Sequence, residues 1–246
     1  MMGSRSEILG RLRRALAKPS LEHHHGHQPE INDMRVLFSS DAVHDSLIDR
    51  FKREFELVNG EMTVCPSIEA AFESVRQLVH ASGFRKVAIS THDLCRQLRL
   101  LERLPVELPE VQFVSETIDS ENVFERDHLT KRLSEVQLSI TGVEYLIADI
   151  GTLVVISNPE ASRQISLLPT AHLVLATTNQ IYPNMAELFL HIQEKYGDNL
   201  PGSALTLITG PSRTADIEKV LIKGVHGPMR LIAILLDCPL SSAPDT

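Results

Sequence analysis

The sequence of 246 residues contains no tryptophan, and aromatic residues make up only 4% of it. No apolar run approaches the roughly 20 residues that a helix needs to cross a bilayer. The first residues are polar and rich in arginine, without the apolar stretch of a signal peptide. These absences predict a cytoplasmic protein with no membrane span.

Cysteine is also scarce. The three cysteines, Cys65, Cys95 and Cys238, are far apart, and none belongs to a Cys-x-x-Cys pair. Neither an iron–sulfur cluster nor a structural zinc site therefore has a sequence signature here. All three lie near apolar residues, which favours buried thiols. We expect no cofactor and no metal in this chain.

Basic residues are outnumbered, with 24 Lys and Arg against 32 Asp and Glu and a formal net charge of -8. A chain with this balance is not built to bind nucleic acid or an anionic membrane. Hydrophobic residues make up 43% of the sequence, enough for one large core or two small ones.

The chain divides by composition into four parts. Residues 1–18 are predicted to form a basic amphipathic helix. Such a helix can touch a membrane or RNA, or it can pack on its own domain or a partner subunit; the acidic remainder favours packing. Residues 19–33 are a linker whose histidines, between His23 and His27, can bind a transition metal adventitiously. One domain follows over residues 34–240, and residues 241–246 are a tail.

Within the domain, β-rich runs alternate with amphipathic helices. Ser67 caps one helix that Gly83 ends, and Pro105 closes another over Leu94–Leu104. The run His172–Thr177 is typical of a strand. This succession predicts an α/β fold with a mostly parallel sheet covered by helices on both faces, a three-layer α/β/α arrangement.

One stretch of the second half combines a strand, a breaker pair and a helix. The strand is Leu205–Thr209, Gly210-Pro211 ends it, and Thr214 is the predicted N-cap of a helix. A helix N-terminus attracts anions, and Ser212 and Arg213 add donors beside it. In the alternative interpretation the hydroxyls there only cap the helix.

A second bend, Thr141-Gly142, follows another strand, and one or two helical turns are predicted between it and Gly151-Thr152. Ligands of open α/β sheets gather at the carboxyl ends of strands, so both bends are predicted to face one crevice there. Arg163 and His172 can reach it from an adjacent loop, although His172 equally fits a hydrogen-bonded residue at the start of a strand.

The predicted ligand of this crevice is a small carboxylate or phosphate, held by Arg213 and by backbone N–H groups near Ser212. The alternative is a structural ion-pair network of Asp149, Arg213 and Asp216. The predicted helix spans about ten residues, or roughly 15 Å, which would place His226 at the other edge of the sheet from Arg213.

Four sequence blocks together resemble one family. They are Ser139–Val154, Ser166–His172, Thr209–Glu218 and Gly224–Pro228. The chain resembles the LUD-domain family, most strongly over residues 136–237.

The resemblance implies a three-layer α/β fold similar to those of sugar-phosphate isomerases and CoA transferases. It also implies a cluster-free component of a system that oxidises L-lactate to pyruvate, with iron–sulfur clusters in partner proteins. The family commonly has Glu-Thr where this chain has Asp149-Ile150. The carboxylate is kept on a shorter arm and the hydroxyl is lost, which would harm a precisely placed nucleophile.

Two other functions remain open. An enzyme of the CoA-transferase or isomerase kind needs a carboxylate that faces a cleft and whose pKa is raised. Asp149 and Glu144 are the candidates for it. A binding module would sense an organic acid without turning it over. The sequence also leaves open whether the chain forms a homo-oligomer.

Overall fold

A computed structural model describes residues 46–115, 130–157, 163–197, 199–215, 221–223 and 227–238, and only the backbone of 213–215 and 221–223. The predicted helical arm, linker, histidine cluster and tail lie outside these residues. Among the helices that are described, none has the length and apolar character to cross a membrane.

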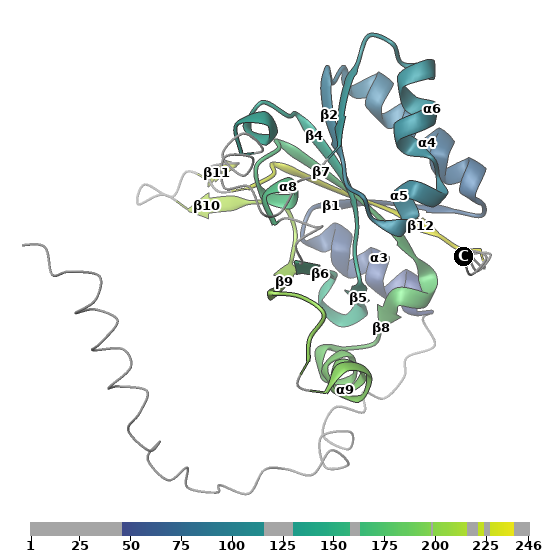
Figure 1. Ribbon diagram of the computed structural model, residues 1–246. Coiled ribbons are helices and arrows are strands. Elements are labelled where there is room, and N and C mark those ends of the chain that lie inside the picture. Colours follow the sequence, from purple (N-terminus) through teal and green to yellow (C-terminus); the bar gives the residue numbers. More distant parts are fainter. Residues whose placement is uncertain are drawn as a thin grey trace, which may run out of the picture. The chain divides into compact units, whose positions relative to one another are not determined.

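A six-stranded sheet, which we call the large sheet, forms the centre of the fold (Figure 1). Its strands, in spatial order, are β1 (Gly60–Cys65), β12 (Arg230–Leu236), β7 (Ala171–Thr177), β4 (Leu138–Gly142), β2 (Lys86–Ile89) and β3 (Gln112–Ser115). Every neighbouring pair is parallel. All residues of β4 and β7 are buried, as expected for strands covered on both faces. The α/β class and the parallel sheet are confirmed.

Helices α4 (Ile68–Ser82), α5 (Asp93–Gln97) and α6 (Leu100–Glu107) cover one face of the large sheet. The predicted caps of α4 are confirmed, because Ser67 Oγ accepts from the N–H of Ala70 at 3.1 Å and Gly83 adopts a left-handed φ of 66°. The single helix predicted over residues 94–104 is wrong. The chain takes a left-handed turn at Arg99, with φ 54°, which separates α5 from α6, and Pro105 lies inside α6.

The opposite face of the large sheet carries α3 (Leu47–Leu57) and a four-stranded small sheet. The strands of the small sheet, in spatial order, are β8 (Ile181–Tyr182), β5 (Tyr145–Ile147), β6 (Thr152–Ser157) and β9 (Ala204–Ile208). β6 is antiparallel to both β5 and β9. The helical turns predicted between Gly142 and Gly151 are therefore wrong apart from one 3-10 turn, η1 (Ala148–Ile150), because the β-prone residues of β5 pair with β6.

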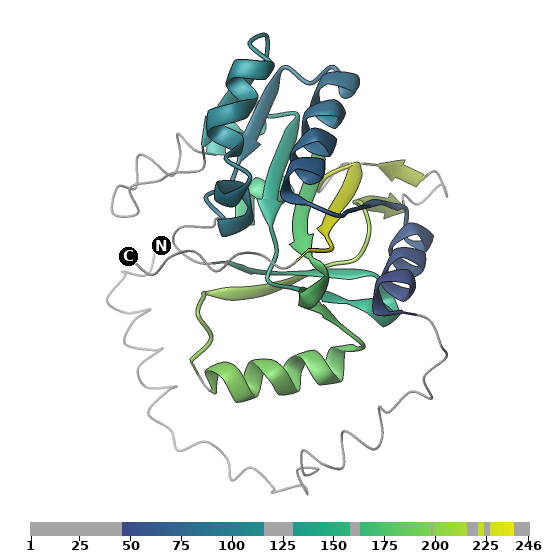
Figure 2. The ribbon, with the colours of Figure 1, turned by 90° about the vertical axis from the view of Figure 1, so that its right-hand side faces the viewer.

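The small sheet contributes to a hydrophobic cluster on each of its faces. Leu146 and Leu153 pack against β7 and β12 of the large sheet, in a cluster with Val174 and Leu231. The opposite face packs on α9 (Met185–Tyr196), which lies below the small sheet in Figure 2. The predicted caps of α9 are confirmed: Asn184 Oδ1 accepts from the N–H of Glu187 at 2.9 Å, and the helix ends at Gly197.

Gly151 marks the closest approach between the small sheet and α3. It has a left-handed φ of 55°, and a Cβ atom there would lie 2.3 Å from the backbone nitrogen of Phe55. The backbone of α3 therefore fills the space that any side chain at this position would need.

We predict that Gly151→Ala lowers the free energy of unfolding by about 2–5 kcal/mol, the sum of left-handed strain and overpacking. Gly83→Ala is the matched control, because Gly83 has a similar φ of 66° with no atom within 4 Å of an added Cβ. The control should lose only the strain of about 1–2 kcal/mol. If urea unfolding shows that the two variants lose equal amounts of the free energy of unfolding, overpacking against α3 is contradicted.

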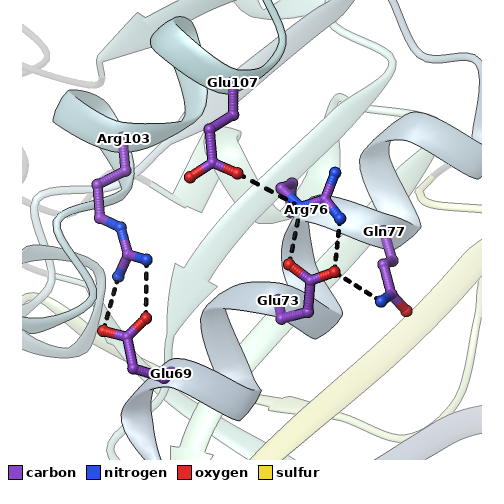
Figure 3. A network of polar contacts seen from close by, with 6 residues as sticks. All are labelled: Glu69, Glu73, Arg76, Gln77, Arg103 and Glu107. Carbon is purple, nitrogen blue, oxygen red and sulfur yellow. Dashed lines mark hydrogen bonds and ion pairs between the residues drawn. The ribbon is translucent and has the colours of Figure 1, made fainter.

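Ion pairs tie α6 to α4 across the first face (Figure 3). Arg103 donates to both carboxylate oxygens of Glu69, at 3.0 and 2.8 Å, and its guanidinium lies 3.5 Å from the centre of the Phe72 ring. Arg76 donates to Glu73 and lies 3.4 Å from a carboxylate oxygen of Glu107. The hydrogen bonds from Arg76 and Gln77 lower the pKa of Glu73 from 4.5 to about 2.

We expect the Glu73 carboxyl to titrate near that value when followed by carbon-13 NMR, and to return toward its ordinary range in Arg76→Gln. Because the folded pKa is lowered, any stability from this pair is present above pH 4.5 and lost as the pH falls through about 2. A wild-type Glu73 that titrates near 4.5 would show that the pair does not persist in solution.

Candidate functional site

The stretch after β9 forms a bend and a hairpin. β10 (Arg213–Ala215) pairs in an antiparallel manner with β11 (Leu221–Lys223), so that Arg213 lies opposite Lys223. The helix predicted from Thr214 is therefore wrong, and so is the helix N-terminus that was to hold an anion. The apolar residues after Thr214 were too few to distinguish the period of a helix from that of a strand. The β-prone residues of β11 instead form backbone hydrogen bonds with β10.

This hairpin also removes the reason for separating Arg213 from His226. The argument needed a helix of about ten residues, whereas Arg213 and Lys223 are directly paired. His226 itself and Asp216 lie outside the described residues. Of Arg213 and Thr214 only the backbone is described, so their proposed contacts with a ligand stay predictions.

The bend at Gly210 helps to form a cavity of about 320 Å³, which we call the Gly210 crevice. Gly210 has a φ of 75°, and a Cβ atom there would meet the carbonyl oxygen of Val58 at 2.4 Å. The N–H of Ser212 donates to the carbonyl of Pro228 at 2.8 Å, which joins the bend to the segment before β12. The described lining residues are Ser166, Leu167, His172, Thr206, Leu207, Ile208, Thr209, Gly210, Pro211, Ser212, Gly227, Pro228 and Leu231.

The Gly210 crevice lies at the amino ends of β7 and β12, because His172 and Leu231 are the second residues of those strands. The predicted location at the carboxyl ends is wrong for this bend. β9 belongs to the antiparallel small sheet, so its end does not meet the carboxyl ends of the parallel strands. Gly142 lies opposite Leu175, three residues or about 10 Å further along β7 than His172. The two glycine-marked bends thus do not line one crevice.

His172 is a buried polar residue of the crevice. Its side chain is fully buried, and its Nε2 lies 2.8 Å from Thr141 Oγ1 on the neighbouring strand β4. Within the described part of the chain Nδ1 has no hydrogen-bond partner. Burial lowers the pKa of His172 from 6.5 to about 4, so the imidazole is neutral at pH 7. With Thr141 Oγ1 donating to Nε2, the proton lies on Nδ1, which is then a buried donor without a hydrogen-bond partner among the described residues.

Some of the other predicted ligand-binding residues line the crevice, some lie behind its wall, and some are not part of its described lining. Ser212 and Gly210 line it, and Thr141 lies behind His172. Thr152 lies behind the wall, where its hydroxyl is 2.8 Å from that of Thr209. Gly142, Gly151 and Arg163 are not among the described lining residues; Arg163 begins α8 (Arg163–Leu167) and is exposed.

The predicted catalytic carboxylates, Glu144 and Asp149, also lie away from the described lining. Glu144 Oε2 accepts from the N–H of Ile156 at 2.7 Å, and burial raises the Glu144 pKa against the effect of that bond. Burial also raises the Asp149 pKa, while the nearby charge of Arg50 on α3 opposes this. Glu144 is thus bonded to the backbone of β6. Asp149 lies beside α3, and its Oδ1 is buried without a hydrogen-bond partner among the described residues.

Several lining residues were not predicted. Ser166 and Pro228 belong to two of the sequence blocks that resemble the LUD-domain family, and those blocks were the available signal for them. Thr209 directly follows β9 and begins a third of these blocks, whereas Thr206, within β9, had no signal apart from its place before the Gly210 bend. None of the described lining residues is Asp, Glu, Lys or Arg, so the lining is polar but uncharged.

Among the described residues, no group of three or more His, Cys, Asp or Glu could hold a metal ion. Cys65 and Cys95 are buried and Cys238 is half-buried, all as free thiols.

We predict that the free energy of unfolding falls by about 3 kcal/mol between pH 6.5 and pH 4 because of His172 alone. The folded pKa is lowered, so the unfolded state binds the extra proton in this window and stability is lost as the pH falls. In His172→Gln this part of the pH dependence should disappear, whereas His80→Gln on an exposed position of α4 should keep it. An unchanged pH profile in His172→Gln would contradict a buried neutral imidazole.

Comparisons with known proteins agree with this architecture. The model of the LUD domain matches residues 48–236. The uncharacterized protein YkgG of Escherichia coli is 29% identical over 244 residues, 96% of this chain and 100% of that protein. Lactate utilization protein C of Halalkalibacterium halodurans is 35% identical over 115 residues, 46% of this chain, and the match spans only 50% of that relative.

A longer match joins this chain to lactate utilization protein C of Anoxybacillus flavithermus, with 28% identity over 192 residues, 78% of this chain and 81% of that protein. The crystal structure of a DUF162 family protein from Deinococcus radiodurans has a similar fold. Its TM-score is 0.52 at 18% identity, and the match covers 77% of this chain and 96% of that one. Because the family model spans both sheets and the Gly210 crevice, the chain belongs to the LUD domain family.

Proposed function

We propose that this chain is a component of an L-lactate utilization system and binds the substrate or product acid in the Gly210 crevice. The names of the relatives support the system, since several are lactate utilization protein C. One observation carries the choice of ligand. The described lining combines hydroxyl and backbone groups with a buried neutral His172 and contains no Asp or Glu, so a carboxylate meets no like charge there.

The size and polarity of the crevice suit a small organic acid. Its volume of about 320 Å³ is at the lower end of the range for ligand pockets, roughly 300–1,000 Å³. Lactate and pyruvate each carry a carboxylate next to a hydroxyl or keto group. The Ser212 hydroxyl and the His172 Nδ1–H can donate to the carboxylate, while Leu231 and Ile208 contact the methyl group.

In this proposal the chain holds the organic acid and the iron–sulfur clusters belong to partner proteins. Oxidation of L-lactate to pyruvate releases two electrons and two protons, so the bound acid must lie close to an electron acceptor. Exposed apolar side chains surround the crevice: Leu167 and Leu207 line it, and Met229 directly follows its lining residue Pro228. Such a rim suits contact with another protein.

The positions of the two candidate carboxylates, Glu144 and Asp149, fit an enzyme of the CoA-transferase or isomerase kind less well. Both mechanisms need a carboxylate at the reacting centre. Glu144 is bonded to the backbone of β6 and Asp149 packs beside α3, and neither is among the described residues that line the crevice.

We predict that L-lactate and pyruvate raise the melting temperature of the isolated chain, and that Ser212→Asp abolishes this effect. A carboxylate at residue 212 would repel an anionic ligand, weakening binding by roughly tenfold or more. Ser134→Asp is the matched control, because it adds the same charge at an exposed position, the last of helical residues 130–134. Equal stabilisation of wild type and Ser212→Asp, or no stabilisation of either, would contradict the proposed ligand.

The role in lactate utilization has its own test in the native cell. Deletion of the gene should abolish growth on L-lactate but not on glucose, and the wild-type chain but not Ser212→Asp should restore it. Affinity capture of the wild-type chain should recover iron–sulfur proteins. Normal growth of the deletion strain on L-lactate would contradict the proposal, and acyl transfer between CoA and a carboxylic acid by the isolated chain would favour the transferase.

A further inference from the structure

A second cavity lies at the carboxyl ends of β2 and β3, the opposite edge of the large sheet from the Gly210 crevice. Its volume is about 300 Å³. The described lining residues are Ile89, Ser90, Thr91, Cys95, Arg96, Arg99, Leu100, Leu101, Glu102 and Ser115. The lining combines two guanidinium groups and several hydroxyls with an apolar wall. We call it the Arg99 cavity.

The topology of the sheet places this cavity where ligands of α/β proteins bind. After β2 the chain enters α5, whose Leu94 and Cys95 pack on the face of the sheet that α4 and α6 cover. The next described helical residues after β3, 130–134, pack on the opposite face, where Leu133 contacts the cluster of Ala88 and Val114. Neighbouring parallel strands with connections on opposite faces define a switch point, and a crevice forms outside their carboxyl ends.

Arg99 is held at this edge by its backbone. Its φ of 54° is left-handed, a conformation that costs a residue other than glycine about 1–2 kcal/mol. It joins α5 to α6 and brings Arg96 and Arg99 to the same cavity. Strain of this kind persists where the surrounding structure requires it, and it is concentrated at functional sites.

The two arginines of the cavity have local and exposed partners. Arg96 pairs with Asp93 and Arg99 pairs with Glu102, each three residues away, and both pairs are more than half exposed. Both Nε and Nη2 of Arg99 donate to one oxygen of Glu102. Exposed pairs of this kind contribute at most about 1 kcal/mol, so a ligand anion can replace the carboxylate without a large loss.

Arg103, on α6, shows the contrasting arrangement (Figure 3). It binds both oxygens of Glu69 on α4, and its guanidinium lies over the Phe72 ring. Arg103 thus fastens α6 to α4, whereas the pair of Arg99 and Glu102 joins no two elements of the fold. The structural role that explains Arg103 does not explain Arg99.

We propose that the Arg99 cavity binds a small phosphate monoester. The phosphate would lie between the guanidinium groups of Arg96 and Arg99, whose two positive charges balance a dianion and whose planar forks match its oxygens. The buried Ser90 lies at the end of β2 beside this position. The organic part would contact the apolar wall of Ile89 and Leu100. Glu102 occupies the fork of Arg99 until the ligand replaces it.

Titration of the full chain with inorganic phosphate and with phenyl phosphate, followed by amide NMR, tests this site. We expect shifts at Ser90 and Arg99, with tighter binding of phenyl phosphate because its ring reaches the apolar wall. Arg99→Gln should weaken binding by roughly tenfold or more. Glu102→Gln should tighten it by roughly two- to fivefold, since it removes the carboxylate that competes for Arg99.

Two control variants carry the same charge changes on α6. Arg103→Gln and Glu107→Gln should leave the affinity for phenyl phosphate within twofold of wild type, and far-ultraviolet circular dichroism checks that all four variants fold. Equal weakening by Arg99→Gln and Arg103→Gln, or no tightening by Glu102→Gln, would overturn the assignment. So would acetate binding as tightly as phosphate, or phosphate shifts confined to the Gly210 crevice.

Discussion

The packing of the small sheet on the second face of the large sheet determines where the candidate site forms. Apolar residues of β7 and β12 meet apolar residues of β5 and β6 in one buried cluster, including Val174, Leu231, Leu146 and Leu153. Burial of such side chains contributes about 1.5–3 kcal/mol each. Because β9 pairs with β6, this contact also brings the Gly210 bend to the amino ends of β7 and β12. The Gly210 crevice thus lies between the two sheets.

Much of the architecture could be predicted from the sequence where local signals agreed with the tertiary structure. Helix α4 begins after Ser67 and ends at Gly83, as predicted, and α9 begins after Asn184 and ends at Gly197. These ends were predictable because caps satisfy backbone groups that any helix end exposes. The buried strands of the large sheet followed from continuous apolar runs. The small sheet was not predicted, since a short apolar run does not show which sheet a strand will join or in which direction.

The site was predicted in part, for reasons that differ from residue to residue. His172, Gly210 and Ser212 line one cavity, as expected, and Thr141 reaches it through His172. The predicted location of this cavity was wrong. The rule that ligands bind at the carboxyl ends of strands applies to parallel sheets, and β9 belongs to the antiparallel small sheet. It was also wrong to expect a helix after Ser212, where a hairpin forms instead. At the carboxyl ends themselves lies the Arg99 cavity, whose arginines no motif had singled out.

The central claim is that the Gly210 crevice, whose described lining residues are uncharged, holds the carboxylate of a small organic acid. A crystal structure of the chain soaked with pyruvate tests it most directly. The account predicts pyruvate in the Gly210 crevice, with carboxylate oxygens within hydrogen-bonding distance of the Ser212 hydroxyl and His172 Nδ1. Pyruvate bound instead against Asp149 or Glu144, or an empty crevice at saturating pyruvate, would contradict it.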